Sequence, residues 1–295
     1  MKIKCMNNLP STIALNPKKI YISAIIATFN GGRYILELLE SIASQTHRVD
    51  EIVVCDDCSS DDTLDILQRF KLKYYYLNIK IIKNESQLGV TKNFSKAIKL
   101  SVGDLIFLAD QDDIWHNNKV ETMLYAYING NSSYIISDMN IVNMEGGVEK
   151  FTWAELMENN YGISKRNIMN GCAVVATKKF FRSCLPIPPG KGHDVWFAYC
   201  AKRLKTRLFL DRPLMNYRIS PQGVSSQFLV DKLNLGKNKK EQQINNNLKT
   251  LIKSGKPLML LRIKLLMHLH FMFVAVKFKS FTRFKLTSGG KHHGK

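Results

Sequence analysis

The chain has 295 residues, 45% hydrophobic and 23% charged, a composition typical of a globular protein with a full core. Its net charge is +19, and residues 231–295 carry +13 of this through 15 Lys and Arg against two acids. No helix-turn-helix, zinc or RNA-binding motif accompanies the charge, which argues against a nucleic-acid partner.

Six cysteines are too few for a disulfide framework in a chain of this length, and four of them lie in or beside apolar segments, as reduced thiols do. The first 19 residues lack an apolar stretch with a small-residue cleavage site, so we expect no secretory signal in them. We treat residues 1–19 as an N-terminal extension. Both features favour a cytoplasmic setting.

The first 137 residues alternate between strand-like and helix-like patterns. Expected strands are the apolar runs 20–28, 51–55, 79–82, 105–109 and 134–137. Expected helices occupy residues 34–44, 59–70, 90–100 and 118–126. This alternation predicts an α/β fold with a mostly parallel central sheet flanked by helices.

Beyond residue 137 the pattern is looser. We expect a loop with some helical tendency at 144–160, a strand at 171–177 and a helix at 193–204. Two short strands, 208–210 and 214–219, follow. No internal repeat is apparent.

Three carboxylates follow directly after the apolar run 105–109. Asp110, Asp112 and Asp113 repel one another at this spacing, and a divalent cation between them would relieve the repulsion. Strand ends in open α/β sheets are also where ligands bind. The structural alternative is a solvated acidic turn that caps the next helix, and the motif alone favours neither.

Polar residues also follow the first two expected strands. Thr28, Asn30 and two glycines lie between strand and helix, where backbone can approach a ligand closely. G-x-G-x-x-G and Walker A patterns are both absent from this position. Asp57 follows the second strand, where it suits a ribose or base contact, or alternatively caps the following helix.

Eight motifs in order resemble a family 2 glycosyltransferase of the GT-A fold, closest to bacterial rhamnosyltransferase-like enzymes of surface polysaccharide synthesis. They are IIATFNGGRYILELLESIASQT, VVCDDCSSDDT, NESQLGVTKNFSKAI, GDLIFLADQDDIW, ISDMNIVN, NGCAVVATKKF, GHDVWFAY and MNYRIS, and they cover about residues 20–224. The resemblance implies a catalytic domain at 20–230, with a nucleotide-binding half at 20–137 and an acceptor half at 138–230.

The resemblance implies roles for individual residues in the donor site. Thr28, Asn30 and Asn93 would line the nucleotide pocket, Asp57 would contact the base, and Asp110 would contact the ribose. Asp112 would bind Mg²⁺ or Mn²⁺, with Asp113 in support; both ions fit an all-oxygen site completed by phosphates and water.

Asp194 matches the general base of the family. A base on the face opposite the leaving group gives single displacement with inversion. His193, Trp196 and Arg218 are candidate contacts to the acceptor or the diphosphate, although His193 and Trp196 also suit structural roles. Ser220 stands where relatives often have a histidine, which puts the details of the metal shell in doubt.

Residues 231–295 form a basic extension with apolar residues interspersed. Its longest stretch free of Lys and Arg, residues 265–276, is too short to span a bilayer, but the pattern suits an amphipathic helix on an anionic membrane. A helix that packs on the core or on a partner is the alternative.

We therefore expect an inverting, metal-dependent glycosyltransferase at the inner face of the cell membrane. It would move a sugar, with rhamnose one candidate, from a dTDP- or UDP-sugar to a hydroxyl of a lipid-linked glycan. The alternatives are a non-catalytic glycan- or nucleotide-binding module on the same scaffold, and a sugar nucleotidylyltransferase.

Overall fold

The computed structural model describes residues 19–142, 148–161 and 164–218. The strands are β1 (Ile22–Thr28), β2 (Glu51–Asp56), β3 (Ile79–Lys83), β4 (Leu105–Asp110), β5 (Ile114–Trp115), β6 (Tyr134–Val142), β7 (Val148–Thr152), β8 (Val174–Thr177) and β9 (Arg207–Arg218). The helices are α1 (Ile35–Ala43), α2 (Thr63–Lys73), α3 (Val90–Leu100), α4 (Lys119–Ile128), α5 (Trp153–Tyr161), α6 (Lys178–Cys184) and α7 (His193–Arg203). Two short 3₁₀ turns are η1 (Lys165–Asn167) and η2 (Gly171–Ala173).

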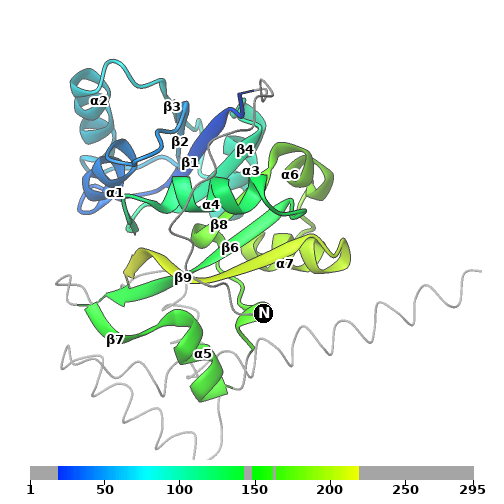
Figure 1. The fold of residues 1–295 in the computed structure, drawn as a ribbon. Coiled ribbons are helices and arrows are strands. Elements are labelled where there is room, and N and C mark those ends of the chain that lie inside the picture. Colours follow the sequence, from blue (N-terminus) through cyan, green and yellow to red (C-terminus); the bar gives the residue numbers. More distant parts are fainter. Residues whose placement is uncertain (1–18, 143–147, 162–163, 219–295) are drawn as a thin grey trace, which may run out of the picture.

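These strands form one sheet, with helices on both sides of it (Figure 1). The strand order is β3-β2-β1-β4-β8-β6-β9-β5, and β7 pairs with β6. The four strands from β3 to β4 are parallel to one another, whereas β8 is antiparallel to both β4 and β6. The α/β fold predicted from the alternating pattern is confirmed.

The core is centred on β1, β2 and β4, which are covered on both faces. A parallel strand that is buried on both faces needs apolar side chains at every position. The sequences of β1, β2 and β4 are therefore nearly continuous apolar runs. In β4, every side chain from Leu105 to Ala109 is at most 1% exposed. Such a strand is rigid, and it fixes the direction in which the following acidic residues leave the sheet.

The second half of the chain differs in places from the predicted elements. The two short strands expected at 208–210 and 214–219 belong, as far as residue 218, to the single strand β9, which pairs with β6 through an irregular register. Residue 219 lies outside the described residues. The expected strand 171–177 begins with η2, and the expected loop 144–160 contains β7 and α5. Sequence periodicity also missed β5 and α6, because a strand of two residues and a helix of seven are too short to show a period.

The antiparallel pairing of β8 with β4 brings a later segment to the acidic end of β4. Leu105 pairs with Thr177 and Phe107 pairs with Val175, so residues before Val174 continue towards the carboxyl end of β4. The turn η2, which contains Cys172, therefore lies beside Asp110. β6 and β9 pair with each other and continue the sheet beyond β8. β9 also pairs with β5, which directly follows the acidic turn.

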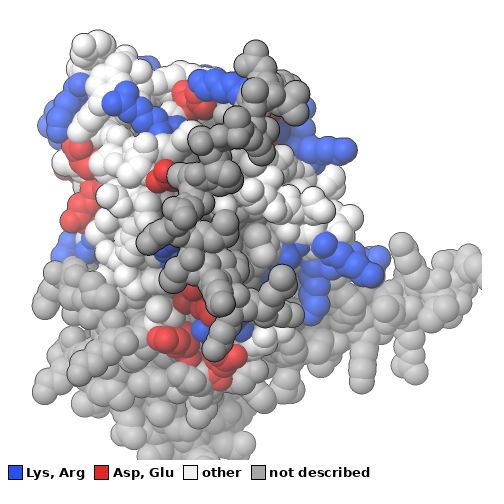
Figure 2. Space-filling model, in the orientation of Figure 1, with Lys and Arg blue, Asp and Glu red and all other residues white. Residues whose placement is uncertain are grey.

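Basic side chains on the face drawn in Figure 2 lie in separate groups near its periphery, with acidic residues between some of them. No helix among the described ranges is both long enough and apolar enough to cross a membrane. The extensions at residues 1–18 and 231–295, together with Ser220, lie outside the described residues.

Candidate active site

Three strand ends that the sequence marked as polar meet at one edge of the sheet. In the parallel register, Thr28 of β1 is paired with Asp56 of β2, and Ala27 is paired with Asp110 of β4. The loops that follow β1, β2 and β4 therefore leave the sheet side by side. This edge is the usual ligand site of an open α/β sheet.

The loops after β1 and β2 are locked together by hydrogen bonds. The backbone N–H of Gly32 donates to the Asp61 carboxylate at 2.9 Å, and the Asn30 side-chain oxygen accepts from the backbone N–H of Ser60 at 2.9 Å. A Cβ on Gly32 would lie 1.8 Å from an Asp62 oxygen, so a larger residue there would have to displace the Asp62 side chain. Asn30 itself is exposed and holds a positive φ of 49°, a conformation that asparagine tolerates better than most residues.

Asp57 and Asn93 are buried and bonded within the protein. The Asp57 carboxylate accepts from the Asn84 amide and from the backbone N–H groups of Leu88 and Gly89 at 2.7–2.8 Å, so it holds the loop after β3. It does not cap α2, so that alternative is wrong, while its contact with a base stays a prediction. Asn93 is 1% exposed and donates to the Cys55 carbonyl at 2.7 Å.

Asn93 is therefore held within the protein behind the loops, and its contact with a nucleotide stays a prediction. Thr28 is similar: it is 1% exposed, and its hydroxyl donates to Gln111 at 2.8 Å. Among the predicted nucleotide-pocket residues, Asn30 remains accessible at the loop surface. Beside it, Phe29 exposes 43% of its surface, which gives the same loop an aromatic face.

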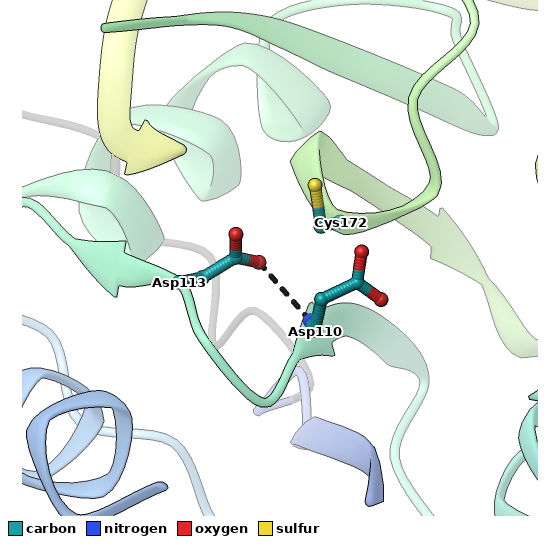
Figure 3. Close-up of side chains that lie close together, drawn as sticks. All are labelled: Asp110, Asp113 and Cys172. Carbon is teal, nitrogen blue, oxygen red and sulfur yellow. Dashed lines mark hydrogen bonds between the residues drawn. The ribbon is translucent and has the colours of Figure 1, made fainter. Parts of the chain in front are cut away.

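The acidic turn after β4 is compact: Asp110 and Asp112 are half-buried and Asp113 is buried, so the turn is not the fully exposed one of the structural alternative. One Asp113 oxygen accepts from the backbone N–H of Asp110 at 3.0 Å, and the side chain is 1% exposed (Figure 3). The other Asp113 oxygen is buried and has no hydrogen-bond partner. Figure 3 shows Cys172 of η2 beside the Asp110 carboxylate, and ligand atoms of Asp110, Asp113 and Cys172 lie within 4.8 Å of one another.

Burial and mutual repulsion favour the protonated forms of these carboxyl groups. Burial, with repulsion from Asp112 and Asp194, raises the pKa of Asp110 to about 7. Burial, with repulsion from Asp110 and Asp112, raises the pKa of Asp113 well above its usual range. For Asp112, burial raises the pKa, while the nearby Arg218 opposes the shift.

These residues fit a divalent metal. A buried carboxylate oxygen without a partner and a cluster of mutually repelling acids are both relieved by a cation, and carboxylate oxygens suit Mg²⁺ and Mn²⁺. Asp112, the predicted principal ligand, is not in the group of Asp110, Asp113 and Cys172, although it lies in the same turn. The Cys172 thiol has a pKa raised well above normal by burial, so it stays protonated and is a poor ligand for a hard cation.

Asp194 lies in the first turn of α7, where a negative charge suits the positive end of the helix dipole. One of its oxygens accepts from the backbone N–H of Val195 at 2.7 Å. Its charge contributes to the raised pKa of Asp110, so the two carboxylates belong to one electrostatic site. The packing of α7 beside η2 and α3 therefore brings the predicted base to the acidic turn.

His193 and Trp196 are held inside the fold. His193 is 8% exposed and stacks on Phe94 with ring centroids 4.3 Å apart, while burial lowers its pKa. A Cβ on Gly171 would lie 2.6 Å from its Nε2, so the ring fills the space under η2. The Trp196 indole N–H donates to the Cys184 carbonyl at 2.7 Å. Both side chains position α7, and their predicted ligand contacts gain no support.

Arg218 ends β9 next to the acidic turn. Its guanidinium forms an ion pair with Glu37, lies 4.6 Å from the centroid of the Tyr34 ring and reaches the Asp112 carbonyl at 3.4 Å. The side chain is 5% exposed, so it is already packed between α1 and the turn. This position is compatible with the predicted contact to a diphosphate beside Asp112.

Two residues of the site escaped sequence reasoning. Gln111, between the first two acids of the turn, accepts from the backbone N–H of Phe29 and donates to the Phe29 carbonyl, which ties the turn to the loop after β1. Lys119 is fully buried next to the acidic turn. The position of Gln111 between two acids of the motif could have indicated its place in the site. Nothing in the sequence indicates that Lys119 is buried.

The comparison with known proteins decides the family, because glycosyl transferase family 2 matches residues 23–182, more than half of the chain. The chain belongs to glycosyl transferase family 2. Among its relatives, UDP-Glc:alpha-D-GlcNAc-diphosphoundecaprenol beta-1,3-glucosyltransferase WfgD of Escherichia coli is 27% identical over 70% of this chain and 79% of the relative. The dTDP-rhamnosyl transferase RfbG of Shigella flexneri is 29% identical over 65% and 71%.

A solved structure shares the fold of this family 2 chain. Mannosyltransferase PcManGT from Pyrobaculum calidifontis, in complex with GDP-Man and Mn²⁺, superposes with a TM-score of 0.57 over 92% of this chain and 82% of its own. The sequence identity is 14%, so the likeness concerns the fold. The GT-A fold predicted from the motifs is confirmed.

The raised pKa of Asp110 predicts that metal binding depends on pH. Below pH 7 a proton on Asp110 competes with the cation, so the affinity for Mn²⁺ should rise with pH between 6 and 8 and level off above. The slope should approach about tenfold per pH unit at the acid end. Calorimetric titration with Mn²⁺ across this range measures it.

The matched control for this titration is Asp110→Asn, which cannot take up the proton and should show a shallower pH dependence. A wild-type affinity that stays constant from pH 6 to 8 would contradict a cation site close to the Asp110 carboxylate.

Proposed function

We propose that this family 2 chain is a metal-dependent, inverting glycosyltransferase. It moves a sugar from a nucleotide-sugar donor, a dTDP- or UDP-sugar with rhamnose as one candidate, to a hydroxyl of a lipid-linked glycan. The observation that carries the proposal is the electrostatic coupling of the Asp194 carboxylate to the acidic turn that begins at Asp110. The Asp194 carboxylate can accept a proton while the carboxylates of the acidic turn hold the donor.

The donor fits the edge formed by β1, β2 and β4. The loop after β1 exposes Asn30 and the aromatic ring of Phe29, which would contact the nucleoside, and Asp110 at the end of β4 would contact the ribose. Asp112, with Asp113 behind it, would hold Mg²⁺ or Mn²⁺ against the diphosphate. When bound, that cation neutralises the charge that develops on the leaving nucleoside diphosphate.

The transfer itself is a single displacement. The acceptor hydroxyl oxygen attacks the anomeric carbon, its proton passes to the Asp194 carboxylate, and the bond from that carbon to the diphosphate oxygen breaks with its electrons. A base on the face opposite the leaving group makes the reaction inverting. Arg218 supports the leaving diphosphate, because its guanidinium lies beside Asp112.

The acceptor and the location follow from the relatives and from the basic extension. The name of the Escherichia coli relative specifies a diphosphoundecaprenol acceptor, which is lipid-linked. The extension, residues 231–295, carries +13 and suits the anionic inner face of the cell membrane. A peripheral position there would bring the domain to such an acceptor.

Replacement of the proposed base gives a direct test of catalysis. Asp194→Asn removes the proton acceptor but keeps the size of the side chain, so it should lower transfer about 10²–10⁴-fold. Affinity for the donor and for Mn²⁺ should change little. The measurement pairs a transfer assay over dTDP- and UDP-sugars with calorimetric binding of each nucleotide.

The control is Asp65→Asn on the exposed face of α2, which should behave as the wild type. An Asp194→Asn variant with full transfer activity would exclude Asp194 as the base. A wild-type protein that binds nucleotide but transfers no sugar would favour the non-catalytic binding module.

Removal of residues 231–295 tests the membrane proposal. Because these residues carry most of the net charge, the deletion should abolish sedimentation with anionic phospholipid vesicles. Binding of Mn²⁺ and UDP should remain, which shows that the catalytic domain is intact. The matched control is the full-length chain with zwitterionic vesicles, to which it should not bind. If the deletion variant binds anionic vesicles as well as the full-length chain does, the membrane role is refuted.

A further inference from the structure

Lys119 is the most unusual charged residue of the described structure, because it is completely buried at the start of α4. Its ammonium donates to the Cys172 carbonyl at 3.1 Å, lies 3.2 Å from the Met215 sulfur and sits 4.3 Å from the centroid of the Trp115 ring. These three partners are all uncharged. A buried ammonium requires compensation by negative charge, which must come from further away.

The helix gives no reason for a lysine at this position. Lys119 is the first residue of α4, where the helix dipole favours acids and disfavours cations. A medium-sized apolar side chain would also fill the space between Trp115 and Met215. The reason for the positive charge of Lys119 must therefore lie outside helix α4.

The compensating charges are the carboxylates of the acidic turn. Burial lowers the pKa of Lys119 to about 8, and attraction to the Asp113 and Asp110 carboxylates opposes that fall. Reciprocally, attraction to Lys119 opposes the rise in pKa of both carboxyl groups. The same ammonium joins α4 to η2 through Cys172 and to β9 through Met215. One buried cation thus connects three elements around the proposed metal site.

We infer that Lys119 is a positioning residue that acts as the resident cation of the site. This inference rests on the proposed function. Three carboxylates, one ammonium and one divalent metal sum to zero charge, so the loaded turn is neutral and can accept a diphosphate. Lys119 holds the turn and η2 together before the metal arrives, and it repels that metal while it favours the nucleotide.

The variant Lys119→Met tests this because it removes the charge and keeps the length of the side chain. The donor-free variant should bind Mn²⁺ about tenfold more tightly, since the repelling charge beside the acidic turn is gone. It should bind UDP, in the presence of saturating Mn²⁺, about tenfold more weakly, since the loaded turn is now negative. Calorimetry measures both, with the exposed Lys99→Met as the control.

Opposite changes in the two affinities distinguish an electrostatic role from simple damage to the fold. A variant that binds both Mn²⁺ and UDP more weakly, or both unchanged, would overturn the inference. Failure of the wild-type protein to bind Mn²⁺ would instead count against the proposed metal dependence.

A stability cycle tests Lys119 without any ligand. Lys119→Met should lower the melting temperature, because it leaves the repelling carboxylates of the acidic turn without their counter-charge. Asp113→Asn removes one of those carboxylates, so it should cost less in the Lys119→Met background than in the wild type. The double variant should lose clearly less than the sum of the two single losses. Asp113→Asn keeps an oxygen that can accept from Asp110, so the charge is the main change. Additive losses would refute the coupling between the two residues.

Discussion

Repulsion among carboxylates at the end of β4 is the constraint on which the rest of the site depends. Asp110, Asp112 and Asp113 leave a rigid, fully buried strand within four residues, and Asp194 adds its charge from α7. Such a cluster of charges is unfavourable by itself, and the raised pKa values of Asp110 and Asp113 reflect this repulsion. A divalent metal and the buried Lys119 would both relieve this repulsion, and only a neutralised turn can accept a negatively charged diphosphate.

The surrounding fold supplies rigidity more than chemistry. Gln111 ties the acidic turn to the loop after β1, and that loop is tied in turn to the loop after β2 through Gly32 and Asp61. Asp57 fixes the loop after β3 in the same way. The hydrogen bonds between loops mean that the donor edge is preformed, so little of the binding free energy is lost to ordering it.

The sequence was informative where a pattern extends over many residues. The parallel strands β1 to β4 follow from four apolar runs separated by helical periods, and the acidic turn follows from its place after β4. It does not show which polar side chains are buried. Asn93 and Thr28 carry the right motif but face inward, and Lys119 belongs to a residue type that is rarely buried. Contacts between distant segments determine these orientations, and no local pattern records them.

The proposed roles are divided between the two halves of the chain. Glycosyl transferase family 2 accounts for residues 23–182, whereas Asp194 and Arg218 lie beyond the matched region and join the site through α7 and β9. The second half of the chain therefore completes a site that the first half begins. This arrangement places the proposed base and the proposed diphosphate contact on elements that are separate from the donor-binding loops.

The most direct test of the account is a crystal structure of the full chain with Mn²⁺ and UDP, with the metal located by its anomalous signal. The account predicts a single peak at the acidic turn, within about 2.3 Å of an Asp112 oxygen, between that carboxylate and the diphosphate. UDP bound elsewhere, or bound at this edge without a metal at the acidic turn, would contradict it.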